Sequence, residues 1–407
     1  MKGSNNQHSL NSASKPFHLQ LARFLPYLLL LAFGVTIGII ISFYLKSFSL
    51  SQQFNQFSRS SSQNAPPPMP PPPPIEKPIM PHPPIEKPKE VPNSNLMGQV
   101  GLKEFIKPSN VVHDMSDEEL LWRASMTPKI REYPFDRVPK VAFMFLVRGP
   151  VPLAPFWEMF FNGHEGYYSI YVHSNPSYDG SDPESSVFHG RRIPSKIVEW
   201  GKFNMIEAER RLLANALLDL SNQRFVLISE SCIPLFNFST IYTYLIHSTQ
   251  SYVMAYDEHS PVGRGRYNIH MSPVITIEQW RKGSQWFEMD RELALEVVSD
   301  RTYFPVFQEY CQVPCYADEH YLPTFISIMF PEKNSDRSLT WVDWSKGGLH
   351  PAKYVRPEVT VAFLENLRNQ KCKYNGDQQN VCFLFARKFL HTSLTRLLRF
   401  APRVMHF

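Results

Sequence analysis

The chain has 407 residues, 43% of them hydrophobic, and a formal net charge of only +5. No run of about five like charges occurs, which argues against a nucleic-acid-binding tail or a domain-wide basic surface. The first stretch of about 100 residues does not look globular, so roughly 270 to 290 residues remain, enough for one large or two fused α/β domains.

A segment long enough to span a membrane lies near the N-terminus. Residues 24–45 contain no charged side chain, and a helix of that length crosses roughly 30 Å of hydrocarbon. We predict a transmembrane signal anchor. A cleaved signal peptide is the less favoured interpretation, because the apolar run is longer than is usual in signal peptides and no small-residue cleavage site follows it. Residues 1–23 carry Lys2, Lys15 and Arg23 but no acid, which favours a cytoplasmic tail and a lumenal domain.

Residues 46–95 have the composition of a disordered stalk. They are rich in Ser, Gln and Asn and then in Pro, and they repeat Pro-Ile-Glu-Lys-Pro at 74–78 and 84–88. Such a segment forms no packed core and favours the extended polyproline conformation. A ligand for domains with aromatic grooves is the alternative, although such partners are not expected in a lumen. Residues 96–137 are then a lead-in to a lumenal globular domain at 138–407.

The cysteines and one sequon fit a lumenal compartment. Five cysteines lie in the predicted lumenal part, at Cys232, Cys311, Cys315, Cys372 and Cys382. Oxidising conditions permit disulfides, and Cys311 with Cys315 and Cys372 with Cys382 are the closest pairs in sequence. Connectivity does not follow from spacing, and buried free thiols are the alternative. Asn237 begins an Asn-Phe-Ser sequon and is a possible glycosylation site.

From residue 140 onward, short apolar runs alternate with helical patterns. Strands are predicted at 140–147, 168–173 and 224–229, each a run typical of a strand buried on both faces. A helix is expected over PLAPFWEMFF, and a second is expected after Asn204, which forms a capping-box pattern with Glu207. This alternation predicts an α/β fold with a mostly parallel sheet and helices on both faces.

Ligands of such a sheet bind beyond the carboxyl ends of its strands. Here Val147-Arg148, His173-Ser174 and Ser229-Glu230 follow the apolar runs. No Gly-x-Gly-x-x-Gly follows a strand, and no Walker motif occurs, so the simplest dinucleotide and nucleotide-phosphate sites are excluded.

Two adjacent acids, Asp318 and Glu319, stand where a helix is predicted to begin. Carboxylates at a helix N-terminus often only cap it, and Asp318 suits that role. Glu319 is then free to deprotonate an acceptor hydroxyl as a general base. The chain has no Asp-x-Asp pair to hold a divalent ion. If a nucleotide diphosphate leaves, Arg387 and Lys388 could meet its charge, although an ordinary solvated strand end is the alternative.

Arginines and aromatic residues form two further clusters. Arg264-Gly265-Arg266-Tyr267 and Trp341-Val342-Asp343-Trp344 could line a groove for a sugar acceptor. Tryptophan pairs are more often part of a hydrophobic core. A metal site at Cys311, Cys315 and His320 lacks a second convincing pair of ligands.

Several segments together resemble the core-2/I-branching glycosyltransferases, family 14, and among them the plant branch named for brittle-culm proteins. The resemblance covers about residues 138 to 395 and includes KVAFMFLVRG, YYSIYVHSNPS, MIEAERRLLANALLD, RFVLISESCIPL, WRKGSQWFEMDRELA, CYADEHYLPT, TWVDWSKGG and CFLFARKF. It implies a type II Golgi membrane enzyme with a fold of the nucleotide-sugar transferase A type. Inverting, metal-independent transfer from a UDP-sugar to a glycan is implied as well, with no cofactor.

The same resemblance assigns roles to residues. Glu319 takes the general-base position, and Lys388, beside Arg387, takes that of a lysine that contacts the diphosphate. Trp341 matches an acceptor-site tryptophan. The other acceptor residues are expected at or near the following positions: Asp257, Glu258, Arg264, Arg266 and Asp318.

The chain departs from the animal enzymes around the donor. The position of a phosphate-binding arginine in those enzymes falls near His350, so His350 or Arg356 could replace that arginine. Ser174 stands at the position of a nucleotide-binding aspartate, and Val147 ends the preceding strand. Cys232 stands at the position of a turn aspartate of the animal enzymes. The donor sugar is therefore N-acetylglucosamine or, as in other plant relatives, glucuronic acid. A non-catalytic lumenal glycan-binding protein that kept the fold is the rival hypothesis. A hydrolase using Asp318 and Glu319 is disfavoured, because adjacent acids rarely flank a sugar at the required spacing of roughly 5 to 9 Å.

Overall fold

The computed structural model describes residues 101–407 except 103–105, 107–109 and 130–131. The described residues belong to one compact unit, Asn93–Phe407. The predicted tail, membrane anchor and stalk at 1–23, 24–45 and 46–95 lie outside the described residues. Within the described part, no helix is both long and apolar enough to cross a membrane.

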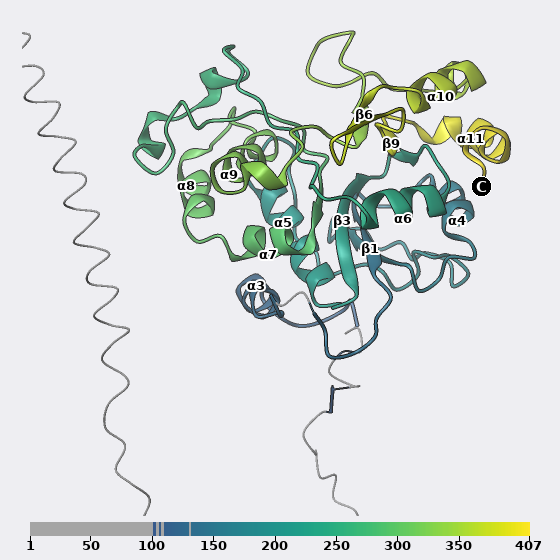
Figure 1. The fold of residues 1–407 in the computed structure, drawn as a ribbon, viewed down its shortest axis with the longest axis horizontal. Helices are drawn as coiled ribbons and strands as arrows, with labels where there is room; N and C mark the ends of the chain where they lie inside the picture. The colour runs from purple at the N-terminus through teal and green to yellow at the C-terminus, as the bar shows by residue number, and fades with distance from the viewer. Residues whose placement is uncertain (1–100, 103–105, 107–109, 130–131) are drawn as a thin grey trace, which may run out of the picture. The chain divides into compact units, whose positions relative to one another are not determined.

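A four-stranded sheet forms the centre of the fold, in the order β2-β1-β3-β5 (Figure 1). The three parallel strands are β1 (Lys140–Leu146), β2 (Tyr168–His173) and β3 (Asn222–Ser229), and the short β5 (Glu288–Asp290) pairs antiparallel to β3. The predicted apolar runs form these parallel strands with shifts of one or two residues at their ends. The mostly parallel sheet of an α/β fold is confirmed, with an antiparallel edge that the sequence pattern did not indicate.

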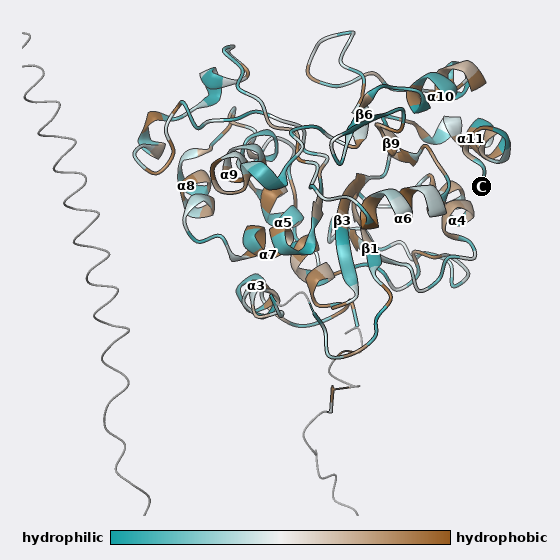
Figure 2. Cartoon of the chain, in the orientation of Figure 1, coloured by the Kyte–Doolittle hydropathy of each residue, from teal (hydrophilic) through white to brown (hydrophobic). Residues whose placement is uncertain are grey.

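Helices cover both faces of this sheet because alternate strand residues point to opposite sides. Ala142 and Met144 pack with α3 (Asp117–Ser125), α5 (Asn204–Leu217) and α7 (Arg291–Ser299). Phe143 and Phe145 pack with α4 (Ala154–Phe161) and α6 (Phe238–Ile246) on the other face. Figure 1 shows α5 and α7 on one side of β1 and β3, and α4 and α6 on the other. The hydrophobic colouring of α4 is visible in Figure 2.

Aromatic rings fill the core under α4. Trp157 is fully buried, and its ring lies 5.2 Å from Phe145 and 5.5 Å from Phe160 in edge-to-face arrangements. Such pairs add about 0.5 to 1.5 kcal/mol each beyond the burial of their area. The sheet is therefore a rigid base for the loops at its carboxyl edge.

A second, three-stranded sheet brings late segments of the chain together. Its order is β4-β9-β6, with β4 at Ile233–Pro234, β9 at Phe385–Arg387 and β6 at Thr340–Val342. The parallel register of β6 and β9 aligns Trp341 with Ala386 and Val342 with Arg387. The final strand begins later than the predicted apolar run and includes Arg387, so this residue is not a solvated position after the strand.

The remaining elements are shorter. The hairpin β7 (Cys372–Tyr374) and β8 (Asp377–Gln379) stands apart from both sheets. The other α-helices among the described residues are α8 (Tyr303–Tyr310), α9 (Tyr321–Met329), α10 (Val361–Arg368) and α11 (Leu394–Phe400). Single 3-10 turns occur at Arg264–Arg266, Ile269–Met271, Ala317–Glu319, Pro331–Lys333, Arg356–Glu358 and His391–Ser393, and a π-helical turn occurs at Ala401–Met405.

The start of α5 differs from the sequence interpretation. Asn204 is the first residue of α5 and does not cap it; the residue before the helix is Phe203, which makes no side-chain cap bond. The Asn204 side chain instead accepts a hydrogen bond from the Glu199 amide. A complete capping box is present at α3, between Ser116 and Glu119.

Candidate active site

A cavity of about 1020 Å³ opens at the carboxyl ends of β1 and β3. Leu146 to Arg148 reach it from β1, and Ser229 and Glu230 reach it from β3. β6, β9 and the 3-10 turn Ala317–Glu319 complete its walls. The cavity thus lies where open parallel sheets bind ligands, and its size suits a nucleotide-sugar-sized molecule.

Most of the residues predicted for the site meet at this cavity. Its lining includes Val147, Glu258, Arg266, Asp318, Glu319, Trp341, His350, Arg387 and Lys388. These residues come from segments up to 241 positions apart in the chain, 388 − 147.

Four predicted residues do not line the cavity, and one of them is Arg356, the alternative to His350. The other three have partners elsewhere. Ser174 is buried, and its backbone amide donates to Ser195 Oγ at 3.2 Å. Asp257 and Arg264 form an ion pair with each other at 2.7 Å. Each carboxylate oxygen of Asp257 accepts from the guanidinium, because the two residues flank a tight loop. The direct donor and acceptor contacts expected of these three residues are not supported by this geometry.

Glu319 is held by two cations through one of its oxygens. Oε2 accepts hydrogen bonds from Arg266 Nη1 at 2.8 Å and from Lys282 Nζ at 2.9 Å. Among the described side chains, none donates to Oε1. Glu319 lines the cavity, and a carboxylate anchored through one oxygen keeps the other free to accept a proton from a bound hydroxyl.

The backbone of Glu319 is fixed by a close approach to a neighbouring loop. Its carbonyl accepts from the Gly283 amide at 2.8 Å. A Cβ at position 283 would lie 1.8 Å from the Met254 carbonyl oxygen, so only glycine fits there. The neighbouring Lys282 thereby reaches Glu319 from a segment 37 positions away.

The charge state of Glu319 follows from these partners. Burial opposes ionisation, but the ammonium of Lys282 and the guanidinium of Arg266 outweigh it, so the pKa of Glu319 is lowered from its ordinary value. The carboxyl is therefore an anion at neutral pH. Lys282 lies in the WRKGSQWFEMDRELA segment of the family resemblance, but sequence reasoning gave it no role.

Asp318 has the opposite environment. Its side chain is buried and Oδ1 has no hydrogen-bond partner among the described residues. Burial, together with the negative charge of Glu319, raises the pKa of Asp318 to about 7. The residue before α9 is His320, and no side chain caps that helix, so the interpretation of Asp318 as a helix cap is wrong.

A third carboxyl lies behind this pair. Glu209 of α5 is fully buried and accepts from Gln285 Nε2 at 2.9 Å. Burial raises the pKa of Glu209 well above its ordinary value, and the charge of Asp318 raises it further. Burial thus favours the neutral form of Glu209, and burial beside Glu319 favours the neutral form of Asp318. The negative charge of the group is concentrated on Glu319.

His320 belongs to the packing of this region. It is completely buried, its Nδ1 hydrogen-bonds the Arg281 carbonyl oxygen at 2.9 Å, and its ring stacks on Trp280. Burial lowers the pKa of His320 to about 4. In the described part of the chain, no group of three His, Cys, Asp or Glu side chains is placed to hold a metal ion.

Cationic side chains gather on the wall made by β1 and β9. The Arg387 guanidinium stacks on the Trp286 ring at 3.9 Å, and its Nε has no hydrogen-bond partner among the residues described. Lys388 is half-buried, and burial and the charge of Arg387 lower the pKa of Lys388. The backbone carbonyl of Lys388 accepts from the Tyr354 amide at 2.8 Å, which fixes its position. The exposed Arg148 joins them at the end of β1.

Trp341 combines both roles that the sequence left open. It is half-buried, and its ring lies 5.9 Å from Tyr354 and 5.9 Å from Phe363. It also lines the cavity, so one part of the ring is core and another is available to a ligand. Trp344 remains 49% exposed on the same lining.

Cysteine pairing and the sequon are both defined in the structure. Disulfides join Cys311 to Cys315 and Cys372 to Cys382, and Cys232 is a buried free thiol. Asn237 caps α6, because its side-chain oxygen accepts from the Thr240 amide at 2.9 Å. Glycosylation of Asn237 stays a prediction.

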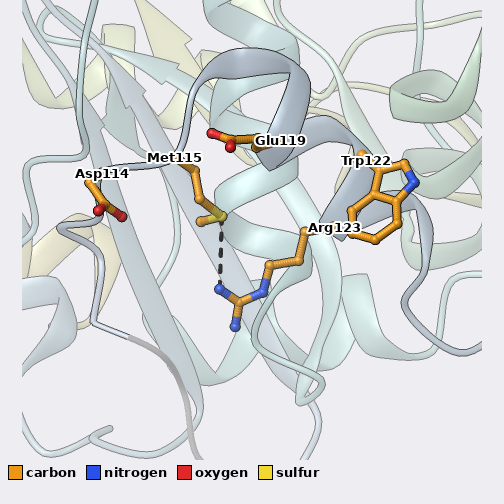
Figure 3. Close-up of a pocket in the computed structure, with 5 residues that line it drawn as sticks. All are labelled: Asp114, Met115, Glu119, Trp122 and Arg123. Atoms are coloured by element: carbon orange, nitrogen blue, oxygen red, sulfur yellow. Dashed lines mark hydrogen bonds between the residues drawn. The ribbon is translucent and has the colours of Figure 1, made fainter.

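A second cavity, of about 260 Å³, lies beside α3 (Figure 3). Figure 3 shows Arg123 directed toward the Met115 sulfur, at 3.8 Å, with Trp122 alongside. Glu119 accepts a hydrogen bond from the Ser116 amide in the helix cap. The smaller cavity does not combine a carboxylate held by two cations with a cationic wall, as the larger cavity does.

A nucleotide-sized cavity at the carboxyl edge of a parallel sheet, with one ionised carboxylate and a cationic wall, has the parts needed for glycosyl transfer. Comparison with known proteins agrees. The family model for Core-2/I-Branching enzymes matches residues 141–368. The glycosyltransferase BC10 of Oryza sativa subsp. japonica is 36% identical over 306 residues, which cover 64% of this chain and 76% of that protein. The chain is a glycosyltransferase, and it belongs to the core-2/I-branching enzyme family.

Proposed function

We propose that this enzyme transfers N-acetylglucosamine or glucuronic acid from a UDP-sugar to a glycan acceptor, with Glu319 as general base. The observation that carries the proposal is the meeting of Glu319 and Lys388 on one cavity. The sheet and its carboxyl-edge cavity are compatible with the nucleotide-sugar transferase A type of fold.

The proposed reaction is a single displacement. An acceptor hydroxyl donates its proton to Glu319 Oε1 while its oxygen forms a bond to the anomeric carbon of the donor sugar. The bond between that carbon and the diphosphate oxygen breaks, and UDP leaves with the electron pair. Attack from the face opposite the leaving group inverts the configuration.

The cationic wall supports transfer without a metal. Arg387 and Lys388 carry charges that can stabilise the leaving diphosphate, with Arg148 close by. Charge-assisted hydrogen bonds to phosphate are the strong class of such contacts. His350 also lines the cavity, but its ring lies 5.1 Å from Trp200, so the proposal gives it no contact with the diphosphate.

The membrane arrangement belongs to the same proposal. The uncharged residues 24–45 and the Pro-rich segment before residue 95 support a type II Golgi protein with a lumenal catalytic domain. The two disulfides of the domain are compatible with an oxidising lumen. The resemblance of the sequence to the plant branch named for brittle-culm proteins suggests an acceptor glycan of the plant cell wall.

A donor panel tests the activity. The full-length chain, purified in detergent, is assayed for hydrolysis and transfer with UDP-N-acetylglucosamine, UDP-glucuronic acid, UDP-glucose, UDP-galactose and UDP-xylose, with EDTA present. Turnover of one of the first two donors, with inversion seen by proton NMR of the product, is the expected result. Turnover only after Mn²⁺ addition would contradict the metal-free mechanism. A folded protein that binds glycans but neither binds nor turns over any donor would favour a non-catalytic glycan-binding role.

A further inference from the structure

Three aromatic rings from distant segments meet at the rim of the cavity. Trp200 lies between Tyr316 and His350, with ring centroids 5.2 Å and 5.1 Å away. All three residues line the cavity, and 51% of Trp200 remains exposed. We call Trp200, Tyr316 and His350 the Trp200 platform.

The platform is held in place by its backbone surroundings. Gly201 has φ +78°, and a Cβ there would lie 2.9 Å from a ring carbon of Tyr316, so the chain at 201 lies directly against that ring. Tyr316 itself has φ 57°, a left-handed conformation that is uncommon for a non-glycine residue. It directly follows the Cys311–Cys315 disulfide. Unusual backbone conformations of this kind cluster at ligand sites.

The platform adjoins the proposed catalytic base. Tyr316 stands three positions before Glu319, and the Arg266 guanidinium lies 4.3 Å from the Tyr316 ring centre. The same guanidinium donates to Glu319 Oε2 at 2.8 Å. One arginine therefore joins the platform to the carboxylate that would receive the acceptor proton.

We propose that the Trp200 platform is a subsite for the acceptor, on which the third or a later pyranose ring stacks, counted from the sugar that accepts the transfer. This inference rests on the proposed function. Large exposed aromatic surfaces that border a polar cavity mark binding sites, and a ring with charged groups beside it suits a ligand with an apolar face and hydroxyl edges. The acceptor is then a glycan longer than a disaccharide.

The competing occupant of the platform is the uracil of the donor, since a nucleobase also stacks on aromatic rings. The position beside Arg266 and Glu319 favours the acceptor. The two occupants differ in which affinity depends on Trp200, and this decides the test.

The experiment uses the full-length chain and variants Trp200→Ala and Trp200→Leu. Trp122→Ala is the matched control, because Trp122 is 62% exposed on α3 and lines the separate small cavity. Acceptor KM is measured for xylo-, cello- and β-galacto-oligosaccharides of about two to six sugars, and the Kd of UDP is measured by calorimetry. Folding is checked independently of ligand binding, by circular dichroism and thermal unfolding.

For the wild type, KM should fall as the acceptor lengthens. Removing Trp200 should raise the KM of long acceptors roughly 5- to 30-fold, the effect of losing one anchoring aromatic side chain. The KM of the disaccharide, kcat and the Kd of UDP should stay within about twofold, and Trp122→Ala should resemble the wild type. Loss of UDP affinity in both Trp200 variants would overturn the proposal in favour of the nucleobase.

Other results would also overturn it. A KM that rises equally for every acceptor length, or a wild-type KM independent of length, excludes a distal sugar subsite while leaving the transferase intact. If the wild type turns over no donor, the proposed function fails separately, and the same oligosaccharides are titrated by calorimetry. Binding that strengthens with length and is lost in Trp200→Ala then supports the subsite, and binding without these features overturns it.

Discussion

Replacing Lys282 by methionine removes one of the two cations that hold the Glu319 carboxylate, 2.9 Å from Oε2. Methionine keeps most of the side-chain volume, so the packing is largely preserved. A hydrogen bond to a charged group is worth about 1.5 to 3 kcal/mol, and 1.36 kcal/mol corresponds to one pKa unit. With Arg266 still in place, the pKa of Glu319 should rise by roughly one to two units.

The direction of the expected shift in the pH profile follows from the charge that Glu319 needs in order to act as a base. Glu319 acts only when ionised, and in the wild type its pKa is lowered despite burial. Without the Lys282 ammonium, less positive charge offsets the effect of burial, so the pKa of Glu319 rises. The acid limb of the kcat/KM profile should therefore move to higher pH by about one to two units.

The assay is the pH dependence of kcat/KM for the turned-over donor, with Lys129→Met as control. Lys129 forms an exposed ion pair with Glu296 at 2.8 Å, and neither residue lines the cavity. The control should keep the wild-type profile. An acid limb that stays in place or moves to lower pH in Lys282→Met would refute the role of Lys282 in holding Glu319 ionised.

Three further predictions concern the donor, a buried acid and a disulfide. Lys388→Ala should weaken UDP binding by about 1.5 to 3 kcal/mol, roughly 10- to 100-fold by calorimetry; unchanged affinity would remove Lys388 from the donor site. The pKa of Asp318, about 7 in the folded chain, exceeds its unfolded value near 4, so its stabilising effect is present below pH 4 and lost as pH rises through 7. Wild-type Tm should therefore fall relative to Asp318→Asn between about pH 4 and 7, and parallel curves would argue against the buried neutral acid. Replacing Cys372 and Cys382 by serine should cost roughly 2 to 3 kcal/mol of unfolding free energy in a denaturant titration; an unchanged midpoint would show that the bridge adds no stability.

The parallel strands could be predicted because each is an apolar run buried on both faces. Phe143 and Phe145 face one helical layer while Ala142 and Met144 face the other, so the whole run must be apolar. The strands β6 and β9 could not be placed reliably. Each has three residues, too few for a periodic pattern, and their pairing depends on Thr340 meeting Phe385 across a gap of 45 positions, 385 − 340.

The site was predictable only where motifs carried it. Glu319 and Lys388 stand in segments that resemble the family, and the structure brings both to one cavity. Lys282 was missed because its role depends on a tertiary contact, the approach of Gly283 to the Glu319 carbonyl. Asp257 and Arg264 were expected at the acceptor, but they satisfy each other in an ion pair instead.

The central claim is that Glu319 takes the proton of the acceptor hydroxyl. The most direct measurement compares the transfer kcat of the wild type and Glu319→Gln at saturating donor, together with the Kd of UDP. Loss of a general base should lower kcat by roughly 10² to 10⁴, while UDP affinity stays within about twofold because Glu319 does not contact the diphosphate in the proposed reaction. A variant that retains wild-type kcat with normal UDP binding would contradict the assignment.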